Sequence, residues 1–488
     1  MDSLRILDAV EKALVPRVAQ PQSRPTRERL GATFRGSEEA LSPRVLRRTL
    51  TELQAIADPK VGEVEGGRRA RGVAGWYARA PLPERQDCWL LMSEQFAPDP
   101  GKLSEAPGQY EAARGTEEEG QAEIRLRRAL HSPRKRLLQR FAVFPEGMAF
   151  LVGLRAELLP HLAQDKRLLV LDAELESLFS TWFDVAFLEL RRLTWDSPAS
   201  LIEKLIKYEA VHDILSWADA RNRLDGDRRC YGFFHPRLDN EPLIFVEVAL
   251  ADRIAESIAP LLDEDAVMSD SLTATTAVFY SISNTQAGLR GVGFGDSLIK
   301  RVVETLKAEL PKVDTFATLS PMPGFRRWFN ENAARLITEL APATSAGLSS
   351  EIGSAADVET LAAALDQPSS LPPRSAVRSF VLQCAAHYLA LGMRNGRPVD
   401  SVARFHLGNG ARVEQINWAG DPSPKGRKQS FGIMVNYLYD LKRIDKHRAM
   451  LDVGNIPISG TVAGLLKKRG KPANRPSLLS LGVAPARK

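Results

Sequence analysis

The chain has 488 residues, of which 44% are hydrophobic and 26% are charged, and its formal net charge is +6. One ordinary hydrophobic core does not support that length, so two or three domains are expected. No stretch approaches eighteen consecutive apolar residues, and the 66 basic side chains are interspersed with 60 acidic ones. We therefore predict no membrane span and no nucleic-acid partner.

The two ends of the chain carry no recognisable targeting signal. The N-terminal segment contains Asp2 and Asp8 and has no unbroken apolar core, which argues against a secretory signal. The last three residues, Ala-Arg-Lys, are not a peroxisomal tripeptide. We expect a cytoplasmic protein. The three cysteines are too widely spaced for a disulfide framework or a metal site and are expected to be buried: Cys88, Cys230 and Cys384.

Residues 1 to 185 are rich in helical patterns. Apolar residues recur at a spacing near 3.6 in four segments, with proline or capping residues between them. Pro98 to Gly120 is rich in proline, glycine and glutamate, and it predicts a mobile connection. We expect this half to serve packing or subunit assembly. The four segments are GSEEALSPRVLRRTLTELQAIA, EIRLRRALHSPRKRLLQRFA, PEGMAFLVGLRAELLPHL and LVLDAELESLFSTWFDVAFLELRRL.

From about residue 186 the pattern becomes mixed. The runs CYGFFHP and PLIFVEVAL predict two strands separated by a turn. Residues 330 to 400 are helical again and are interpreted as an insertion. Ala403 to Trp418 predicts a hairpin that turns at residues 408–410, followed by a loop and the apolar run FGIMVNYLYDL. The tail beyond Gly470 shows no periodicity.

Residues 277 to 325 form the segment around which the second half is organised. A β-branched and aromatic run over Ala277 to Ser283 predicts a buried strand, and glycines follow at positions 288, 291, 293 and 295. Apolar residues at helical spacing then predict a helix from Asp296 until Pro311 ends it. The unpaired N–H groups and the dipole of such a helix start favour a bound pyrophosphate.

The glycine motif is characterised partly by what it lacks. It has no Gly-Lys-Ser/Thr ending, so it is not a P-loop, and its glycine spacing does not fit a dinucleotide fingerprint. Read from Arg290 as Arg-x-x-Gly-x-Gly, it resembles the coenzyme A pyrophosphate loop of the GNAT acyltransferase superfamily. Taken alone, the motif is equally compatible with a glycine-rich turn that binds nothing.

Six separated segments between residues 190 and 440 together resemble malonyl-CoA decarboxylase. The resemblance implies a mixed α/β (α+β) chain, with a helical domain over residues 1–185 and a GNAT-like mixed-sheet catalytic domain with a helical insertion over residues 186–488. It implies a cofactor-independent carboxy-lyase that converts malonyl-CoA to acetyl-CoA and CO2, and a homo-oligomer, dimer or tetramer. The segments are TWDSPASLIEKLIKYEAVH, RRCYGFFHPRLDNEPLIFVEVAL, FYSISNTQAGLRGVGFGDSLIKRVV, TLSPMPGF, FHLGNGA and NYLY.

The resemblance also assigns site residues. It makes Ser320 in Leu-Ser-Pro-Met-Pro-Gly and His406 in Phe-His-Leu-Gly-Asn-Gly the catalytic pair, with Tyr439 close to the histidine. Animal members carry a glutamate in the substrate loop where this chain has Gly293, so whatever tunes His406 must come from elsewhere. The loop that the resemblance assigns to malonyl-CoA comprises Arg290, Gly291, Val292, Gly293, Phe294, Gly295 and Asp296.

Decarboxylation beside a thioester leaves an enolate that must be stabilised and then protonated. Ser320 can bond the carboxylate or the enolate and His406 can donate a proton, but the sequence leaves the division of these roles open. Without the resemblance, Ser320 is interpreted as a turn or cap residue, as a serine before proline most often is, and His235 before Pro236 is a rival histidine. Glu247 either tunes His406 or forms an ion pair.

Further alternatives concern the ligand and the activity. Lys300 and Arg301 either meet coenzyme A phosphates or are solvated. Two other activities fit a loop of this kind. One is a GNAT acyltransferase that moves an acetyl group to an amine, and the other is a non-catalytic regulator that binds acyl-CoA.

Overall fold

The structure is a computed structural model that describes residues 24–36, 39–238, 240–294, 298–340, 342–353, 357–366 and 371–467. The chain divides into two compact units, Met1–Trp182 with Ala287–Val292, and Phe183–Gln286 with Gly293–Lys488. The first is helical and the second is built on a mixed sheet, so the predicted helical domain followed by a mixed-sheet domain is confirmed. No helix in the described ranges is long and apolar enough to cross a membrane.

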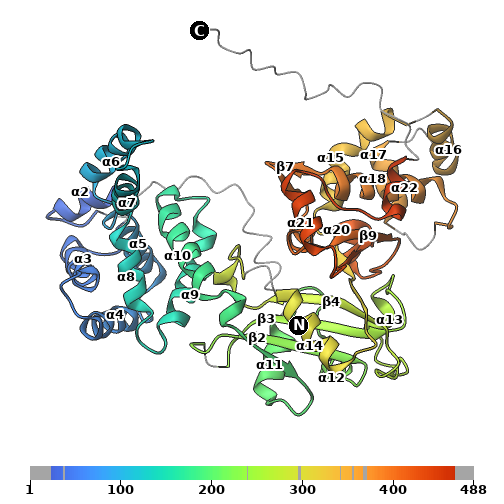
Figure 1. The fold of residues 1–488 in the computed structure, drawn as a ribbon, viewed down its shortest axis with the longest axis horizontal. Coiled ribbons are helices and arrows are strands. Elements are labelled where there is room, and N and C mark those ends of the chain that lie inside the picture. Colours follow the sequence, from blue (N-terminus) through green and yellow to red (C-terminus); the bar gives the residue numbers. More distant parts are fainter. Residues whose placement is uncertain are drawn as a thin grey trace, which may run out of the picture. The chain divides into compact units, whose positions relative to one another are not determined.

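The first unit is a set of short helices (Figure 1, blue to teal). Several begin at a serine or aspartate whose side chain accepts a backbone N–H, with proline next in sequence, as Ser42 and Ser132 do. The helices are α2 (Thr26–Gly31), α3 (Pro43–Ala57), α4 (Glu63–Tyr77), α5 (Leu82–Glu94), α6 (Pro100–Ala113), α7 (Glu119–Ala129), α8 (Pro133–Phe141), α9 (Gly147–Leu158), η2 (Leu159–His161), η3 (Lys166–Leu168), α10 (Leu169–Trp182) and η5 (Ala287–Leu289).

The prediction of a mobile connection over Pro98 to Gly120 was wrong. Most of this segment is helix α6, which packs beside α7. Its start is well specified, because the Asp99 side chain accepts the N–H of Lys102 and Pro100 occupies the first turn. The helix even contains Pro107, so the proline and glycine content that suggested a loop did not prevent a helix.

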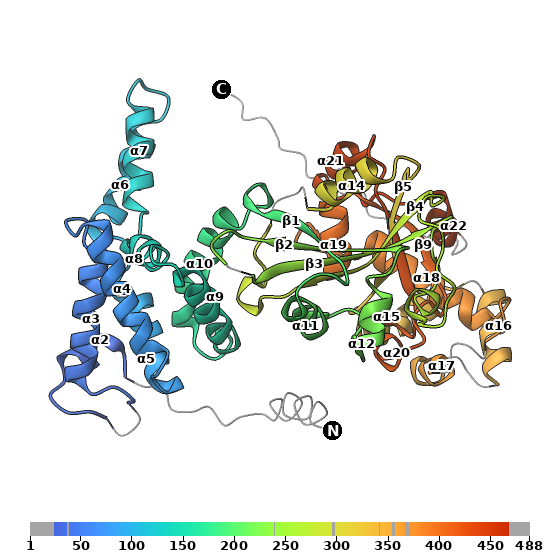
Figure 2. The ribbon, with the colours of Figure 1, turned by 90° about the horizontal axis from the view of Figure 1, so that it is seen from below.

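The sheet of the second unit has the order β1-β2-β3-β4-β5-β10-β6, with β9 also paired to β10. Figure 2 shows β1, β2 and β3 side by side, and all three pairings from β1 to β4 are antiparallel. The β4–β5 pair is parallel, and α14 lies between them in sequence. The strands are β1 (Glu189–Leu193), β2 (Arg228–Phe234), β3 (Pro242–Ala251), β4 (Thr276–Asn284), β5 (Thr315–Thr318), β6 (Ser320–Pro321), β9 (Arg412–Asn417) and β10 (Met434–Leu438). A separate small sheet pairs β7 (Met393–Arg394) with β8 (Arg397–Pro398).

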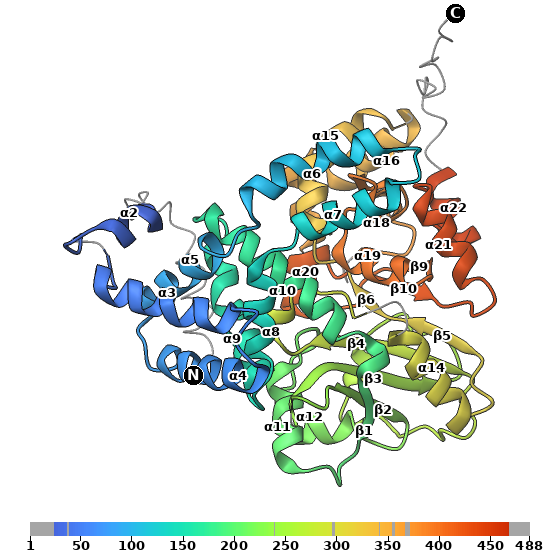
Figure 3. The same ribbon diagram turned by 60° about the vertical axis from the view of Figure 1, so that its left-hand side comes forward.

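Helices surround this sheet (Figure 3). The helical insertion predicted over residues 330–400 is confirmed where the structure describes it. The helices are η4 (Val185–Phe187), α11 (Ala199–Tyr208), α12 (Trp217–Asn222), α13 (Ala259–Leu262), α14 (Leu298–Glu309), α15 (Phe325–Thr338), α16 (Pro342–Ile352), α17 (Val358–Leu365), α18 (Ala376–Leu391), α19 (Ser401–Gly408), α20 (Pro424–Ser430), α21 (Ile444–Asp452) and α22 (Gly460–Lys467).

Two sequence predictions in this unit were also wrong. The segment predicted as a hairpin turning at residues 408–410 begins instead as helix α19, because the Asp400 side chain accepts the N–H groups of Val402 and Ala403 and caps it. Residues 189–193, taken as the end of a helix, form strand β1, which pairs with β2. Tertiary pairing overrode the local helical pattern there.

Candidate functional site

The structure brings Ser320, His406 and Tyr439 into direct contact, although they come from three separate parts of the chain. Ser320 Oγ lies 3.2 Å from His406 Nε2, and Tyr439 Oη lies 2.8 Å from His406 Nδ1. His406 is in α19, Ser320 begins β6, and Tyr439 follows β10 directly. The two ring nitrogens of His406 are thus engaged on opposite sides, by the serine and by the tyrosine.

Two further residues complete this group, which we call the catalytic cluster after the role that we propose for it below: Thr318, Ser320, His406, Tyr437 and Tyr439. The Ser320 hydroxyl donates to Thr318 Oγ1 at 2.8 Å. The Tyr437 ring stacks on the imidazole of His406, with centroids 4.7 Å apart and planes inclined by 26°. Tyr437 and Tyr439 therefore contact the same histidine, as two residues that are two positions apart on an extended chain can do.

The catalytic cluster is deeply buried, and this controls its protonation. Each of its five side chains is at most 5% exposed. Burial lowers the pKa of His406 to about 3, because a charged imidazolium is poorly solvated there. Burial also raises the pKa of Tyr439 far above its usual value. At neutral pH both side chains are therefore uncharged, and either can offer a proton through a hydrogen bond.

Tyr439 also lines a cavity of about 170 Å³. The wall of the cavity includes Ile299, Lys300 and Val303 from the first turns of α14. Its other lining residues come from the ends of α19 and α21 and from the segment between β10 and α21: Asn409, Leu441, Ile444, Asp445 and Arg448. Tyr439, whose hydroxyl contacts His406, thus borders a space of the size that a few water molecules or part of a ligand occupy.

The glycine segment is described only in part. Gly295 and Asp296 lie outside the described residues, whereas Arg290, Gly291 and Gly293 are exposed and Val292 and Phe294 are buried. Gly291 has a φ of +82°, which favours glycine. Gly293 has no such requirement, and a Cβ placed there meets nothing within 4 Å. A side chain fits at that position.

Sequence reasoning missed Arg155, which fixes the glycine segment. This arginine of α9 is buried, and its Nη1 donates to the carbonyl oxygens of Gly288 and Arg290 at 2.8 and 2.9 Å. Its Nε forms an ion pair with Asp172 at 2.8 Å. A Cβ on Gly288 would come within 1.9 Å of the Val152 carbonyl oxygen. Helix α9 therefore fixes the backbone at residues 288–290 of the same unit, and no sequence motif marks Arg155 for that role.

Three residues that the sequence left open have structural partners. His235 Nδ1 accepts the backbone N–H of Arg237, so this histidine stabilises a turn. Arg301 donates to the carbonyl oxygens of Val185 and Leu188, both at 2.6 Å. Lys300 is largely exposed, lies 3.9 Å from Glu304 Oε1 and lines the cavity beside Tyr439.

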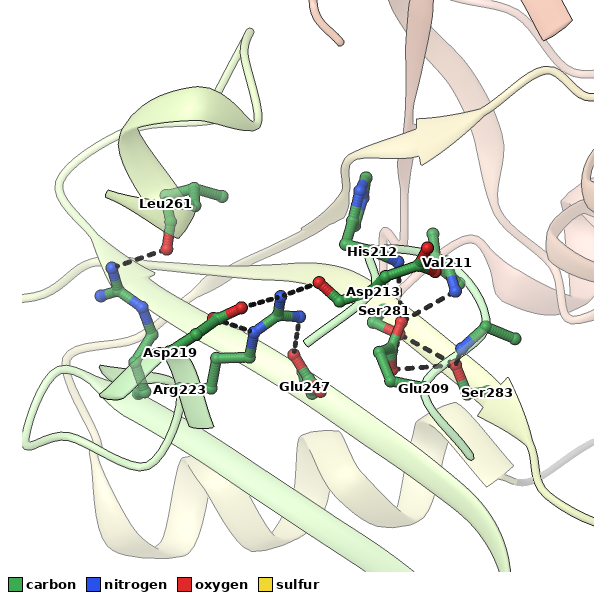
Figure 4. Close-up of polar contacts among 12 residues, drawn as sticks. Glu209, Val211, His212, Asp213, Asp219, Arg223, Glu247, Leu261, Ser281 and Ser283 are labelled. Carbon is green, nitrogen blue, oxygen red and sulfur yellow. Dashed lines mark hydrogen bonds and ion pairs between the residues drawn. The ribbon is translucent and has the colours of Figure 1, made fainter. Parts of the chain in front are cut away.

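Glu247 belongs to a different buried group, which we call the carboxylate network: Glu209, Asp219, Arg223, Glu247, Ser281 and Ser283 (Figure 4). Arg223 contacts Glu247 at 3.3 Å and Asp219 at 2.8 Å, so the ion-pair interpretation of Glu247 is correct. Glu209 accepts hydrogen bonds from Ser281 and Ser283 and from two backbone N–H groups, at 2.8 to 3.0 Å. Burial raises the pKa of Glu247 to about 8.

Comparison with known proteins identifies the family. The family model of the malonyl-CoA decarboxylase C-terminal domain matches residues 186–475, and the model of the N-terminal domain matches residues 96–183. The mitochondrial malonyl-CoA decarboxylase of Anser anser anser is 34% identical over 456 residues, covering 90% of this chain and 89% of the relative. The protein of that name from Rattus norvegicus is 34% identical over 407 residues, covering 77% of this chain and 80% of the relative.

Solved structures agree with these relatives. The crystal structure of malonyl-CoA decarboxylase from Rhodopseudomonas palustris has a TM-score of 0.72 and 40% identity, covering 86% of this chain and 99% of that one. The enzyme from Cupriavidus metallidurans has a TM-score of 0.71 and 41% identity, covering 87% of this chain and 100% of that one. On these matches, the chain belongs to the malonyl-CoA decarboxylase family.

Proposed function

We propose that this protein decarboxylates malonyl-CoA to acetyl-CoA and CO2, with Ser320 and His406 as the catalytic pair. The observation that carries the proposal is the contact between Ser320 Oγ and His406 Nε2, 3.2 Å long and shielded from bulk water. The reaction needs a hydrogen-bonding group for the malonyl head and a proton donor beside it. A serine and a neutral imidazole in contact supply both.

In the proposed reaction the bond between C2 of the malonyl group and its carboxyl carbon breaks. The electron pair stays on C2, delocalised onto the thioester oxygen as an enolate, while CO2 leaves. In the resting protein the Ser320 hydroxyl donates to Thr318, and as the negative charge develops on the substrate this hydroxyl turns and donates its hydrogen bond to that charge. The proton on His406 Nε2 then passes to C2, which gives the acetyl group.

Tyr439 restores the proton that the imidazole loses. Its hydroxyl contacts Nδ1 at 2.8 Å, so it can protonate that nitrogen as Nε2 gives up its proton. The phenol oxygen in turn takes a proton from water in the adjoining cavity. After the products leave, Nδ1 returns its proton to Tyr439, which releases one to water, and Nε2 takes a proton from entering water, so that the tautomer with its proton on Nε2 is restored. In total, each turnover consumes one malonyl carboxylate and one proton, and it forms one CO2 and one acetyl group. Because the pKa of Tyr439 is raised, these transfers are concerted and leave no free phenolate.

For the coenzyme A moiety we propose the segment from Arg290 to Asp296. Exposed glycines and the following helix start offer backbone N–H groups to a pyrophosphate, and Arg155 bonds to the carbonyl oxygens of Gly288 and Arg290 where this segment begins. Lys300 is placed two residues into α14 with its side chain exposed, and it suits a phosphate contact. Arg301 is committed to backbone carbonyl groups and is not part of the proposal.

The wider setting is also proposed. The domain division near residue 185, with the helical part serving assembly into a homo-oligomer, follows from the family membership and from the helical patterns of the sequence. A cytoplasmic enzyme of fatty acid metabolism is the setting that fits a malonyl-CoA substrate, with no nucleic-acid or membrane partner.

The activity is tested with purified protein, malonyl-CoA and no amine acceptor, by measuring CO2 and acetyl-CoA together. We expect equimolar products, and we expect Ser320→Ala to lower kcat while Ser104→Ala, an exposed serine in α6, leaves it unchanged. Turnover only in the presence of an amine would instead support the acyltransferase. Tight binding of acyl-CoA without any turnover would support the non-catalytic regulator.

A further inference from the structure

Thr318 lies at a break in the pairing between β5, β6 and β10. Strand β10 pairs with β5 at Leu438 and Ala317, and with β6 at Val435 and Ser320. Between these points the N–H of Tyr437 donates to the side chain of Thr318, at 3.1 Å from Oγ1. The threonine hydroxyl therefore joins β5 to β10 at this position.

The position of this hydroxyl is fixed from several directions. Thr318 is fully buried, and its own carbonyl oxygen accepts a hydrogen bond from Asn436 Nδ2 at 2.7 Å. The backbone N–H of the next residue, Leu319, bonds to the carbonyl oxygen of Phe279 in β4 at 2.9 Å. Because Thr318 and Ser320 are two residues apart on extended chain, their side chains share a face, and Ser320 donates its hydroxyl proton to Thr318 Oγ1.

This hydrogen bond decides which nitrogen of His406 carries the proton. A serine hydroxyl has one proton, and that of Ser320 points to Thr318. The contact between Ser320 Oγ and His406 Nε2 is then a hydrogen bond only if Nε2 is the donor. A neutral imidazole with its proton on Nε2 has a bare Nδ1, which accepts the hydroxyl proton of Tyr439.

We propose that Thr318 is a positioning residue for the decarboxylation, which orients the Ser320 hydroxyl and thereby holds neutral His406 in the tautomer with its proton on Nε2. The inference rests on the proposed function, because it assigns that tautomer to the protonation of C2. Without the acceptor on Thr318, the Ser320 hydroxyl turns to Nε2, and the imidazole proton moves to Nδ1, away from the substrate.

The tautomer is read directly from the ¹⁵N chemical shifts of the His406 ring, with selectively histidine-labelled protein at neutral pH and His406→Gln to assign the signals. We expect a protonated Nε2 and an unprotonated Nδ1 in the natural protein, and the reverse in Thr318→Val. A proton on Nδ1 in the natural protein overturns the proposal, whatever the variant shows.

Kinetics give a second, independent readout. We expect Thr318→Val to lower kcat roughly 10- to 100-fold with KM within about twofold of the natural value. Thr318→Ser keeps the hydroxyl and is expected to restore most of kcat. Thr315→Val is the matched control from the same strand, because its hydroxyl bonds to Asp314 and has no link to Ser320. Thermal unfolding of each variant shows whether it is folded.

The possible failures are distinguishable. If the natural protein releases no CO2 from malonyl-CoA, the proposed function fails. If the natural protein is active and His406→Gln is not, but folded Thr318→Val keeps full kcat, the positioning role fails while the function stands. If Thr318→Val does not fold, a kcat for Thr318→Ser near that of the natural protein together with the Nε2 tautomer supports the proposal, and the Nδ1 tautomer contradicts it.

Discussion

The catalytic cluster and the carboxylate network are both buried polar groups of the same unit, but they handle charge differently. The carboxylate network matches carboxylates with Arg223 and with hydroxyl and N–H donors. The catalytic cluster contains only hydroxyl groups and an imidazole, and burial holds that imidazole neutral. One group surrounds the buried charge of Arg223 with acidic partners, and the other keeps its members uncharged until substrate brings charge to them.

This difference explains why the two groups suit different tasks. A buried ion pair is costly to break, because removing one partner leaves the other charge without compensation. Such a network is suited to holding the segment around Glu209 against strand β4. A neutral cluster has little charge to compensate in the resting protein, so its hydrogen-bond donors are available to an enolate that forms beside them.

The largest effect is expected from removing the proton donor of the catalytic cluster. His406→Gln keeps a polar side chain of similar reach but has no titratable proton, and it should lower kcat by about 10²- to 10⁴-fold. Stopped-time assays of acetyl-CoA formation measure this. His131→Gln, at an exposed histidine, serves as the matched control. A near-normal kcat in folded His406→Gln would show that the catalytic cluster, like the carboxylate network, supplies no proton to the reaction.

Breaking the carboxylate network should affect stability and spare chemistry. Arg223→Met leaves the buried Asp219 without its cation and should lower the free energy of unfolding by about 3–5 kcal/mol. The kcat per folded molecule should stay close to that of the natural protein. Urea unfolding and an activity assay corrected for the folded fraction measure the two quantities. A large loss of kcat in the folded fraction would show that the network takes part in the reaction.

A smaller loss of kcat is expected when the hydrogen bond to His406 Nδ1 is removed. Tyr439→Phe removes the donor to His406 Nδ1 and leaves a buried nitrogen unpaired, which costs about 1–3 kcal/mol and corresponds to roughly 5- to 160-fold in kcat. Tyr437→Phe is the matched control, since that ring stacks on His406 and donates no hydrogen bond to it. Equal kcat values for the two variants would argue against a role for the Tyr439 hydroxyl.

The smallest effect concerns the pH dependence of stability. The pKa of Glu247 is raised to about 8 in the folded protein, so the folded state binds a proton that the unfolded state has released. This contribution is fully present below the ordinary pKa of glutamate and is lost as pH rises through about 8, which amounts to about 1 kcal/mol between pH 7 and 9. Glu247→Gln should lose less stability over that range. If the free energy of unfolding changes equally with pH in Glu247→Gln and in the natural protein, the raised pKa of Glu247 is contradicted.

Much of the fold could be predicted from the sequence. Strands β2, β3 and β4 and helix α14 are uninterrupted apolar or amphipathic patterns, and such patterns report burial directly. The elements that failed depend on tertiary contacts: strand β1 exists because β2 pairs with it, and α6 forms despite Pro107. Local composition carries no information about β2, which pairs with β1, or about α7, which packs beside α6.

The sequence predicted several residues of the site, but it did not predict the contacts between them. The resemblance gave Ser320, His406 and Tyr439, and the structure shows that they touch. Thr318 could have been noticed as a hydroxyl residue two positions before Ser320, which places it on the same face of an extended segment. Arg155 and the stacking of Tyr437 on His406 join residues far apart in sequence, so no spacing rule reveals them.

The charge state of His406 tests the central claim most directly. A pH titration of its two ¹⁵N ring signals from pH 8 to pH 5, on folded protein without substrate, reports whether the imidazole takes up a second proton. Because burial lowers its pKa to about 3, one nitrogen should stay protonated and the other unprotonated over the whole range. A transition to a doubly protonated ring with a midpoint between pH 6 and 7, the ordinary range for histidine, would contradict the account of a neutral catalytic cluster.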